Sequence, residues 1–492
     1  MLKAALKVLK YAGLALVIVI AMGAVLFAFG LRVVLDGGGS PHLRFVKSAD
    51  AQADELARHR EAQRAQPPPP APAAPEAPSP SANSMPADIP KPDLPTPAAA
   101  TNTLRGSTYW TDFRGPVRDG HYRQQPIRTD WPADGLKPMW KEPVGGGYAS
   151  LVIANGRAFT IEQRGPKEVV AAYDVMTGRE LWTNGWTAAF REMMGGDGPR
   201  ATPTWADGRV YALGAQGEFR VLEDNSGRTI WRTNILEDAG ARNLQWGMSA
   251  SPLIVNNTVV VLPGGPNGQS IVAYDRATGK RAWSAQGDQQ AYSSPMLATL
   301  AGVQQILVFS ASRLMGLTTD GTKVLWEYPW KTQFDINAAQ PLLVADNRLF
   351  LSSGYGTGAA VVEIDNRGEA MSVREVWRSN RMKNQFTSSV LHDGYVYGLD
   401  ENILACIDAG TGDLKWKGGR YGYGQVLLAS GHLIVLTEDG NLALVRATPE
   451  RHDERVRFPA IEGKTWNHPA ISDGVLLVRN LAEMAAFDLR PR

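Results

Sequence analysis

Short stretches in which apolar and polar residues alternate make up most of the chain after residue 106. Turns of the Asp-Gly or Asn-Gly type separate them, as at Asp207-Gly208, Asn155-Gly156 and Asp393-Gly394. Alternation places the apolar side chains on one face of a β-strand, and glycine in the turn adopts a positive φ without steric cost. The pattern therefore predicts an all-β region of short antiparallel strands joined by hairpins.

One unit of sequence recurs through this region. In Ala273–Trp283 an apolar strand end leads into an Asp-x-x-Thr-Gly turn, and a tryptophan follows four residues after the glycine. Ala172–Trp182 and Ala405–Trp416 have the same form, and weaker copies precede Trp231, Trp326 and Trp377. The aspartate can accept hydrogen bonds from the turn, and the tryptophan can bury about 150–250 Å² between adjacent sheets.

Eight such docking positions follow one another at intervals of about 40–50 residues, which is the signature of a repeat architecture. They are Trp140, Trp182, Trp231, Trp283, Trp326, Trp377, Trp416 and, in the eighth place, Phe458. A small-residue or proline step and a second turn within each interval indicate about four strands per unit. We therefore expect one repeat domain over residues 106–492, rather than the several domains that the chain length alone would suggest.

These features predict an eight-bladed β-propeller of four-stranded antiparallel blades. The two ends of the region explain how the ring closes. Trp140 lies in a docking strand without preceding strands, and Met484–Asp488 belongs to an inner set without a docking strand. Pairing these two segments in one composite blade would close the ring. A right-handed β-solenoid is the alternative architecture.

The N-terminal region, residues 1–35, contains an apolar segment. Tyr11–Leu31 carries no charge over 21 residues, which is long enough to cross a bilayer as a helix. Lys3, Lys7 and Lys10 precede it, so we expect a transmembrane helix with a cytoplasmic N-terminus. A cleaved signal peptide is the alternative. No cysteine follows at a position suited to a lipid anchor, so we do not expect a lipoprotein.

Residues 36–105 are predicted to form a juxtamembrane stalk and a disordered linker rich in proline and alanine. Within them, 51–66 could form a short helix, whereas Pro67–Pro97 favours an extended polyproline II conformation. At about 3.1 Å per residue this tract could reach on the order of 100 Å. We expect it to act as a spacer between membrane and propeller, and a proline-motif ligand is the less favoured interpretation.

Charge and cysteine content exclude two classes of partner. The 51 basic and 49 acidic residues give a net charge of +2, so nothing indicates a nucleic-acid partner. Cys406 is the single cysteine. It falls at an alternating strand position, where a small buried side chain is expected, and we predict neither an internal disulfide nor a disulfide-linked partner.

A candidate ligand site follows from the predicted topology. Residues just before each inner strand should meet at one mouth of the central channel, and this set is rich in aromatic side chains. We expect a pocket that can stack a flat ligand, with charged residues at its rim; the alternative is that the rings only plug the channel or pack between blades. The candidate residues are Tyr148, Glu162, Arg164, Arg200, Trp246, Tyr292, Asn337, Lys383, Phe386, Tyr423, Lys464, Trp466 and Asn467.

The A-x-D-x-x-T-G-x-x-x-W units and the lead-in Trp110–Gly120 resemble the tryptophan-docking motifs of the pyrroloquinoline-quinone (PQQ) repeat superfamily. The resemblance covers residues 106–492. It implies a propeller but leaves function open, because the superfamily includes quinoprotein alcohol dehydrogenases and non-enzymatic BamB-type factors of outer-membrane barrel assembly.

The dehydrogenases of this superfamily stack PQQ on a tryptophan, in many members against a disulfide of adjacent cysteines, and hold Ca²⁺ with acidic and amide ligands. This chain has one cysteine and no Asp-x-Asp loop, so we expect no cofactor and assign no catalytic or metal-binding residue. PQQ with Ca²⁺ remains the alternative, because some quinoproteins lack the cysteine pair.

The sequence thus predicts a single-pass inner-membrane protein with its propeller in the periplasm. We expect it to bind or scaffold other envelope proteins, as outer-membrane assembly factors do. BamB-type factors are lipoproteins of the outer membrane, so the predicted membrane helix is a departure from that group. A PQQ-dependent alcohol or sugar dehydrogenase and a carbohydrate-binding propeller are the alternative functions.

Overall fold

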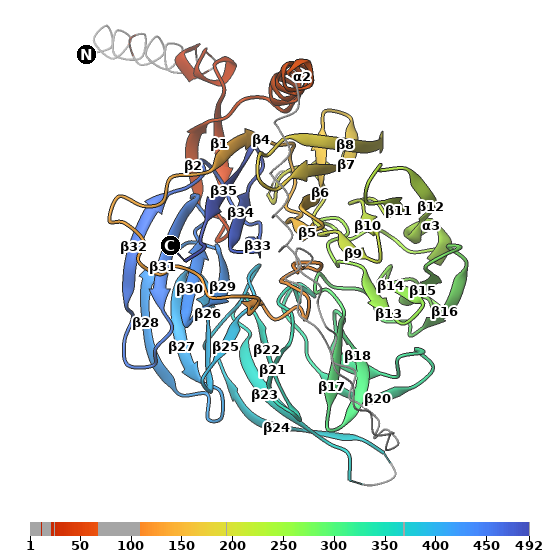
Figure 1. Ribbon diagram of the computed structural model, residues 1–492. Helices are drawn as coiled ribbons and strands as arrows, with labels where there is room; N and C mark the ends of the chain where they lie inside the picture. The colour runs from red at the N-terminus through yellow and green to blue at the C-terminus, as the bar shows by residue number, and fades with distance from the viewer. Residues whose placement is uncertain are drawn as a thin grey trace, which may run out of the picture.

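The computed structural model describes residues 11, 21–23, 25–66, 109–192, 194–367 and 370–491. Within these residues, eight antiparallel sheets are arranged in a ring (Figure 1). Each sheet has four strands, and one sheet has an additional short strand at its inner edge. The predicted eight-bladed propeller is therefore confirmed.

The blades follow the order of the chain, each beginning with its innermost strand. The first four blades are β5 (Val152–Ala154), β6 (Arg157–Arg164), β7 (Lys167–Asp174) and β8 (Glu180–Thr187); β9 (Thr204–Ala206), β10 (Arg209–Leu213), β11 (Glu218–Glu223) and β12 (Thr229–Asn234); β13 (Leu253–Val255), β14 (Thr258–Val261), β15 (Ile271–Asp275) and β16 (Arg281–Ala285); and β17 (Met296–Leu300), β18 (Val303–Phe309), β19 (Arg313–Leu317) and β20 (Val324–Pro329). A short helix, α3 (Ile235–Ala239), follows β12.

The remaining blades complete the ring. They are β21 (Leu342–Ala345), β22 (Arg348–Ser353), β23 (Gly358–Asp365) and β24 (Ser372–Ser379); β25 (Val390–His392), β26 (Tyr395–Asp400), β27 (Ile403–Asp408) and β28 (Leu414–Arg420); β29 (Gln425–Ala429), β30 (His432–Leu436), β31 (Asn441–Arg446) and β32 (Glu454–Pro459), with β3 (His121–Tyr122) added parallel to β29; and β33 (Ala470–Ser472), β34 (Val475–Arg479), β35 (Glu483–Asp488) and β4 (Trp140–Pro143).

The last blade joins the two ends of the propeller. β4 pairs antiparallel with β35, and Trp140 lies opposite Ala486. The predicted composite blade is thus present, and the structure is a closed ring rather than a solenoid. Closure leaves each blade between two neighbours, so its apolar faces are buried on both sides.

Tryptophans and glycine turns join neighbouring blades. The indole N–H of Trp182 donates to the carbonyl of Asp224 in the next blade, at 2.9 Å. Its ring lies against Gly227, and a Cβ atom added to Gly227 would lie 2.4 Å from the Cε3 atom of the ring. Trp140, Trp231 and Trp377 contact the turn of the next blade in the same way. Glycine at this turn supplies the positive φ and also leaves room for the ring.

Trp326 differs from these tryptophans. Its indole donates to Oε1 of Gln305 in its own blade, at 2.6 Å. The turn aspartates behave as their spacing predicts: Asp275 Oδ1 accepts from the amide of Thr278 and from its hydroxyl, both at 2.8 Å. The repeated sequence unit therefore specifies the local turn, whereas the contact of the tryptophan also depends on the blade.

The lead-in before β4 runs inside the ring beside the inner strands. The carbonyl of Trp110 accepts from Ile153, and that of Thr111 accepts from Trp205, both at 2.8 Å. The buried guanidinium of Arg118 donates to the carbonyls of Ser251, Pro252 and Pro295. These bonds join several blades and fill one side of the channel.

Most of the predicted membrane span, Tyr11–Leu31, lies outside the described residues. The described part of this helix ends at Ala28, and Leu31 begins β1 (Leu31–Leu35). The predicted span is therefore too long at its C-terminal end, because a turn at Phe29–Gly30 ends the helix. In the part of the chain that the structure describes, no helix is long and apolar enough to cross a membrane.

Residues 31–66 lie on the propeller. β1 and β2 (Pro41–Phe45) form a hairpin, and α2 (Ala49–Ala65) lies beside β4 and β8 (Figure 1). Arg60 of α2 is 1% exposed and donates to the carbonyl of Pro143 at 2.6 Å. Gln63 accepts from the amide of Glu180 at 2.9 Å.

The contacts of α2 change the interpretation of the Pro/Ala tract. Residues 67–108, which include this tract, lie outside the described part of the chain. Gln66 and Tyr109, which flank these residues, both lie on the propeller. Residues 31–66, which lie between the apolar segment and the tract, already contact the propeller, so the described residues do not support the spacer role expected of the tract.

Candidate functional site

A cavity of about 700 Å³ opens at the mouth of the channel. Phe113 of the lead-in and His468 line it on the inner side. Seven of the predicted residues line it as well: Tyr148, Arg200, Trp246, Tyr292, Phe386, Tyr423 and Trp466. These residues come from different blades. They meet at the cavity because each precedes an inner strand, which is the rule by which the sequence analysis selected them.

The aromatic side chains form two groups around this cavity. Trp466 stacks on Tyr148, with ring centroids 4.9 Å apart, and lies 4.4 Å from Phe386. Trp246 and Tyr292 form the second group at 5.8 Å. Both groups leave part of their rings facing the cavity, so they provide apolar surface for stacking or for contact with a peptide.

Two further aromatic residues at the cavity were not predicted. Phe334 and Tyr355 meet edge to face at 5.5 Å and line the cavity. They lie in loops away from the start of an inner strand, so the rule used on the sequence could not select them. Tyr355 has a positive φ of 55° within a glycine-rich turn, which is the one local signal that it occupies a special position.

Arg200 places a partly buried positive charge beside the cavity. Its guanidinium donates to the carbonyls of Gly196 and Gly198 and lies 4.6 Å from the centroid of the Phe190 ring. Among the described residues it forms no ion pair. Burial lowers the pKa of Arg200, although nearby acidic groups and tyrosines oppose that shift. The arginine remains a cation that is held by carbonyl dipoles and an aromatic face.

Hydroxyl groups connect neighbouring blades below the aromatic residues. Thr202 Oγ1 accepts from the amide of Ser150 at 2.9 Å, and Ser150 Oγ accepts from the amide of His468 at 2.7 Å. Ser294 Oγ accepts from the amide of Ser251 at 2.9 Å. Ser251 Oγ is buried and has no hydrogen-bond partner among the described residues. The sequence analysis did not select these hydroxyls, because serine at a strand start has many ordinary roles.

The turn of the N-terminal hairpin, Asp36–Gly39, enters the mouth. Glu438 Oε1 accepts from the amide of Gly37 at 2.7 Å, and Gln385 Nε2 donates to the carbonyl of Gly37 at 2.8 Å. A Cβ atom on Gly37 would lie 2.3 Å from Cγ of Tyr423. The mouth thus holds a main-chain segment that only glycine can present so closely.

Glu438 connects this turn to the aromatic residues. Its carboxylate also accepts from the indole of Trp466 at 2.9 Å and from the amide of Tyr423 at 3.1 Å. The sequence analysis placed residues 36–47 in the linker and missed this contact. The available signal was the Asp-Gly-Gly-Gly turn between two short alternating segments, which is a hairpin pattern.

Six predicted residues do not line the main cavity. Asn337 and Asn467 are buried and donate to main-chain carbonyls, Asn337 to Ser310 and Asn467 to Ala149. Lys383 pairs with Asp400 at 3.0 Å. These three side chains stabilise the loops behind the cavity. The remaining three are Glu162, Arg164 and Lys464.

Glu162 and Arg164 belong to an ion-pair cluster that faces α2. Arg164 pairs with Glu162 at 2.5 Å and with Glu180 at 2.6 Å, and Glu180 also lies 3.7 Å from Arg60 of α2. Burial alone would raise the pKa of Glu162, but the neighbouring arginines outweigh it and lower that pKa. The cluster therefore supports the docking of α2, not a ligand in the cavity.

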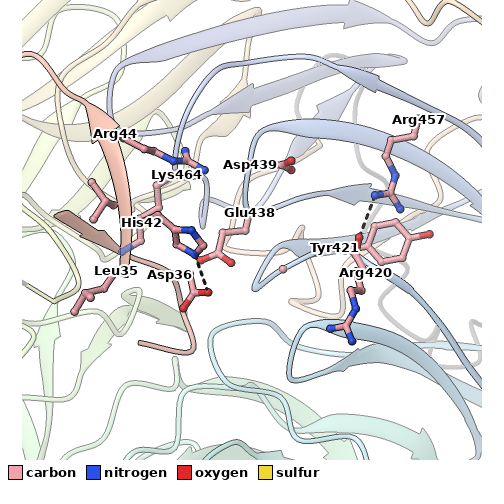
Figure 2. A pocket seen from close by; sticks show the side chains of 12 residues that line it. Leu35, Asp36, His42, Arg44, Arg420, Tyr421, Glu438, Asp439, Arg457 and Lys464 are labelled. Atoms are coloured by element: carbon pink, nitrogen blue, oxygen red, sulfur yellow. Dashed lines mark hydrogen bonds and ion pairs between the residues drawn. The ribbon is translucent and has the colours of Figure 1, made fainter. Parts of the chain in front are cut away.

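Lys464 lies at the edge of a second, smaller pocket of about 220 Å³ between the hairpin and the propeller (Figure 2). Its ammonium group lies 3.7 Å from the centroid of the Trp466 ring. Burial lowers the pKa of Lys464 to about 8, although nearby carboxylates oppose that shift. Asp36, His42 and Arg44 of the hairpin line the same pocket.

The donors around the main cavity do not fit PQQ with Ca²⁺. Asp36 and Glu401 are the acidic residues of its lining. Across the described ranges, no group of three or more His, Cys, Asp or Glu side chains could hold a metal ion. Cys406 lies within β27, and its side chain is buried next to that of Tyr397 rather than at the cavity.

The closed ring, the tryptophans seated on glycine turns and the lined mouth define a PQQ-like repeat propeller. Residues 166–418 match the model of a family described as outer membrane protein assembly factor BamB. The chain belongs to this family.

A curated relative and two solved structures illustrate the range of similar proteins. BamB of Bordetella pertussis is 22% identical over 317 residues, which cover 61% of this chain and 72% of the relative. BamB of Moraxella catarrhalis has a TM-score of 0.51 at 14% identity, covering 72% of this chain and 97% of that one. A europium-containing methanol dehydrogenase has a TM-score of 0.59 at 12% identity, covering 78% and 98%. These structural likenesses show the fold alone.

Proposed function

We propose that this chain is a scaffolding propeller of the bacterial envelope that binds polypeptide segments at its channel mouth. One observation carries the proposal: the mouth holds both main-chain groups of Gly37, the amide through Glu438 and the carbonyl through Gln385. Every peptide offers an amide and a carbonyl, so a mouth built to hold them suits a protein partner.

The side chains around this contact add selectivity. Tyr423 lies so close to Gly37 that a larger residue would clash. The rings of Phe386 and Trp466 lie beside it and offer apolar surface to the flanking residues. We infer that a partner would present a glycine turn at this place, and that the hairpin of the chain itself occupies the mouth until a partner competes for it.

Family membership supports an envelope role of the assembly-factor type, because the matched model and the relative from Bordetella pertussis are described as outer membrane protein assembly factors. We further propose that the apolar segment that begins at Tyr11 and ends at Ala28 tethers the chain to the inner membrane, with a cytoplasmic N-terminus and a periplasmic propeller. Its uncharged composition and the three preceding lysines support this orientation.

The test uses the full chain in detergent and a labelled peptide with the sequence of Val34–Pro41. Gly37→Ala should expel the chain's own turn, because the new methyl group meets Tyr423. A tethered turn competes at an effective concentration in the millimolar range, so its removal should tighten peptide binding roughly tenfold or more. Fluorescence anisotropy measures the affinity.

Ser40→Ala is the matched control, because Ser40 directly follows this turn and its hydrogen bonds to Asp36 are made by its main-chain amide and carbonyl. It should leave the affinity of the native chain unchanged. Adding Glu438→Gln to Gly37→Ala should weaken binding about tenfold, since a hydrogen bond to a charged group is lost. Equal peptide binding by the native chain and Gly37→Ala would contradict the proposal.

A further inference from the structure

The β1–β2 hairpin has one apolar face and one mainly polar face. Its register pairs Leu31 with Phe45 and Val33 with Leu43, which places these four apolar side chains on one face. The other face carries Arg32, Val34, His42 and Arg44. A hairpin that packs on a protein core normally turns its apolar face inward. If this hairpin instead turns its polar face to the propeller, its apolar face is available for another contact.

The polar face meets the propeller. Val34, His42 and Arg44 line the small pocket together with Glu438 and Asp439 (Figure 2). On the apolar face, Leu35 next to the turn also lines the pocket, whereas the residues farther from the turn are exposed: Val33 to 64%, Leu43 to 69% and Phe45 to 67%. Three large apolar side chains on one exposed face are the mark of an interaction surface.

This apolar face continues into the end of the N-terminal helix. The carbonyl of Gly30 accepts from the amide of Val46 at 2.8 Å, which holds the base of the hairpin at the helix end. Arg32 donates to the carbonyl of Phe27, and its guanidinium lies 3.8 Å from the centroid of the Phe27 ring. Val25, Phe27 and Phe29 at this end are exposed, Phe29 to 75%.

We propose that the apolar face of the hairpin, Leu31, Val33, Leu43 and Phe45, lies in the interfacial region of a lipid bilayer, so that the channel mouth faces the membrane. This rests on the membrane tether of the proposed function. The helix end and the hairpin face form one continuous apolar surface, and a bilayer that holds the first can also hold the second. Arg32, whose guanidinium lies on the Phe27 ring at the helix end, adds a positive charge that suits anionic headgroups.

The arrangement gives the hairpin two roles at once. Its outer face contacts lipid, and its turn contacts Glu438 and Gln385 in the mouth. A partner that displaces the turn would therefore act beside the membrane. The Pro/Ala tract does not set the distance from the bilayer, because Gln66 and Tyr109 on either side of it lie on the propeller.

The experiment places the full chain in nanodiscs that contain phosphatidylglycerol and a lipid with a shallow spin label. Leu43→Cys carries an environment-sensitive fluorophore on the proposed lipid face, and Val33→Cys gives a second label beside it. Cys406 does not compete for the label, because it is buried and burial raises the pKa of its thiol to about 12. Asn225→Cys is the control, since this exposed turn residue lies at the end of its blade that is remote from the mouth.

We expect blue-shifted emission from the labels at positions 33 and 43, with spin-label quenching severalfold greater than at position 225. Retention of the chain in the nanodiscs is measured separately by co-purification. A retained chain whose labels at 33 and 43 are no more quenched than the control would overturn the inference while the tether stands. A chain that is not retained would overturn both.

Discussion

Arg118, on the lead-in side of the central channel, and Glu168, on the mouth side, differ in whether the buried group has an ionic partner. On the side of the lead-in, Arg118 is 2% exposed, pairs with Asp112 at 3.0 Å and donates to three main-chain carbonyls. On the side of the mouth, Glu168 is fully buried and Arg200 is partly buried, both beside main-chain groups and aromatic rings, and neither forms an ion pair within the described ranges.

This difference accords with our proposal that the lead-in side is a structural end and the mouth a recognition end. A buried charge whose partners all lie within the chain contributes to the folded state and leaves nothing for a ligand. A buried charge without an ionic partner is costly in isolation, and it can gain a partner when another molecule binds. The aromatic rings of the cavity and the hairpin turn lie at the same end as Glu168 and Arg200, so we expect mutations at the two ends to have different effects.

The largest effect should come from Arg118→Ala at the structural end. Removing the guanidinium leaves Asp112 and three carbonyls without their buried donor, which should lower the free energy of unfolding by about 3–5 kcal/mol. Urea denaturation of the full chain measures it. Arg191→Ala, at an exposed arginine, is the control and should change stability by less than about 0.5 kcal/mol. A small loss in Arg118→Ala would remove the contrast between the two ends.

At the mouth end, Glu168 should make stability depend on pH. Burial raises the pKa of Glu168 to about 7 from an ordinary value of 4.5, although the amide of Ala215 and the indole of Trp186 oppose that shift. Between these two values the folded state holds a proton that the unfolded state has released. The contribution of Glu168 is therefore fully present below pH 4.5 and is lost as pH rises to about 7, by about 3 kcal/mol.

Urea denaturation of the native chain and of Glu168→Gln at pH 5 and pH 7.5 tests this dependence. The native chain should lose stability relative to the variant across the interval. Equal changes in the stability of the two proteins would mean that the pKa of Glu168 is not raised in the folded chain. The buried carboxyl group at the mouth end would then not lower stability at pH 7.5.

The smallest effect should be that of PQQ with Ca²⁺ on the melting temperature of the full chain. A ligand that binds the folded state must raise the melting temperature by mass action, and the donors around the cavity lead us to expect no shift. A saturable increase that disappears in Trp246→Ala would instead make the dehydrogenase function the leading one. Such a result would also mean that the cavity at the mouth end binds a cofactor.

The sequence by itself determined the blades, because their signals are local. At Asp174, Asp275 and Asp408, an aspartate that accepts from amides two and three residues ahead, a glycine with positive φ and a tryptophan four residues later specify the turn without help from distant parts of the chain. The count of eight docking positions predicted the number of blades, and the incomplete ends predicted the pairing of β4 with β35. The position before each inner strand likewise predicted that Tyr148, Trp246 and Trp466 meet at one mouth.

Only the tertiary structure decided the direction of side chains and the place of the N-terminal segment. The sequence analysis predicted that Glu162 and Arg164 of β6 lie at the mouth, yet they belong to the ion-pair cluster that faces Arg60 of α2. Gly37 meets Glu438 across 401 residues of chain. No local pattern encodes such a contact, because it depends on the shape of the finished mouth and on the absence of a side chain at one glycine. Because of this contact, residues 36–39, which were predicted to belong to a stalk, lie in the candidate site.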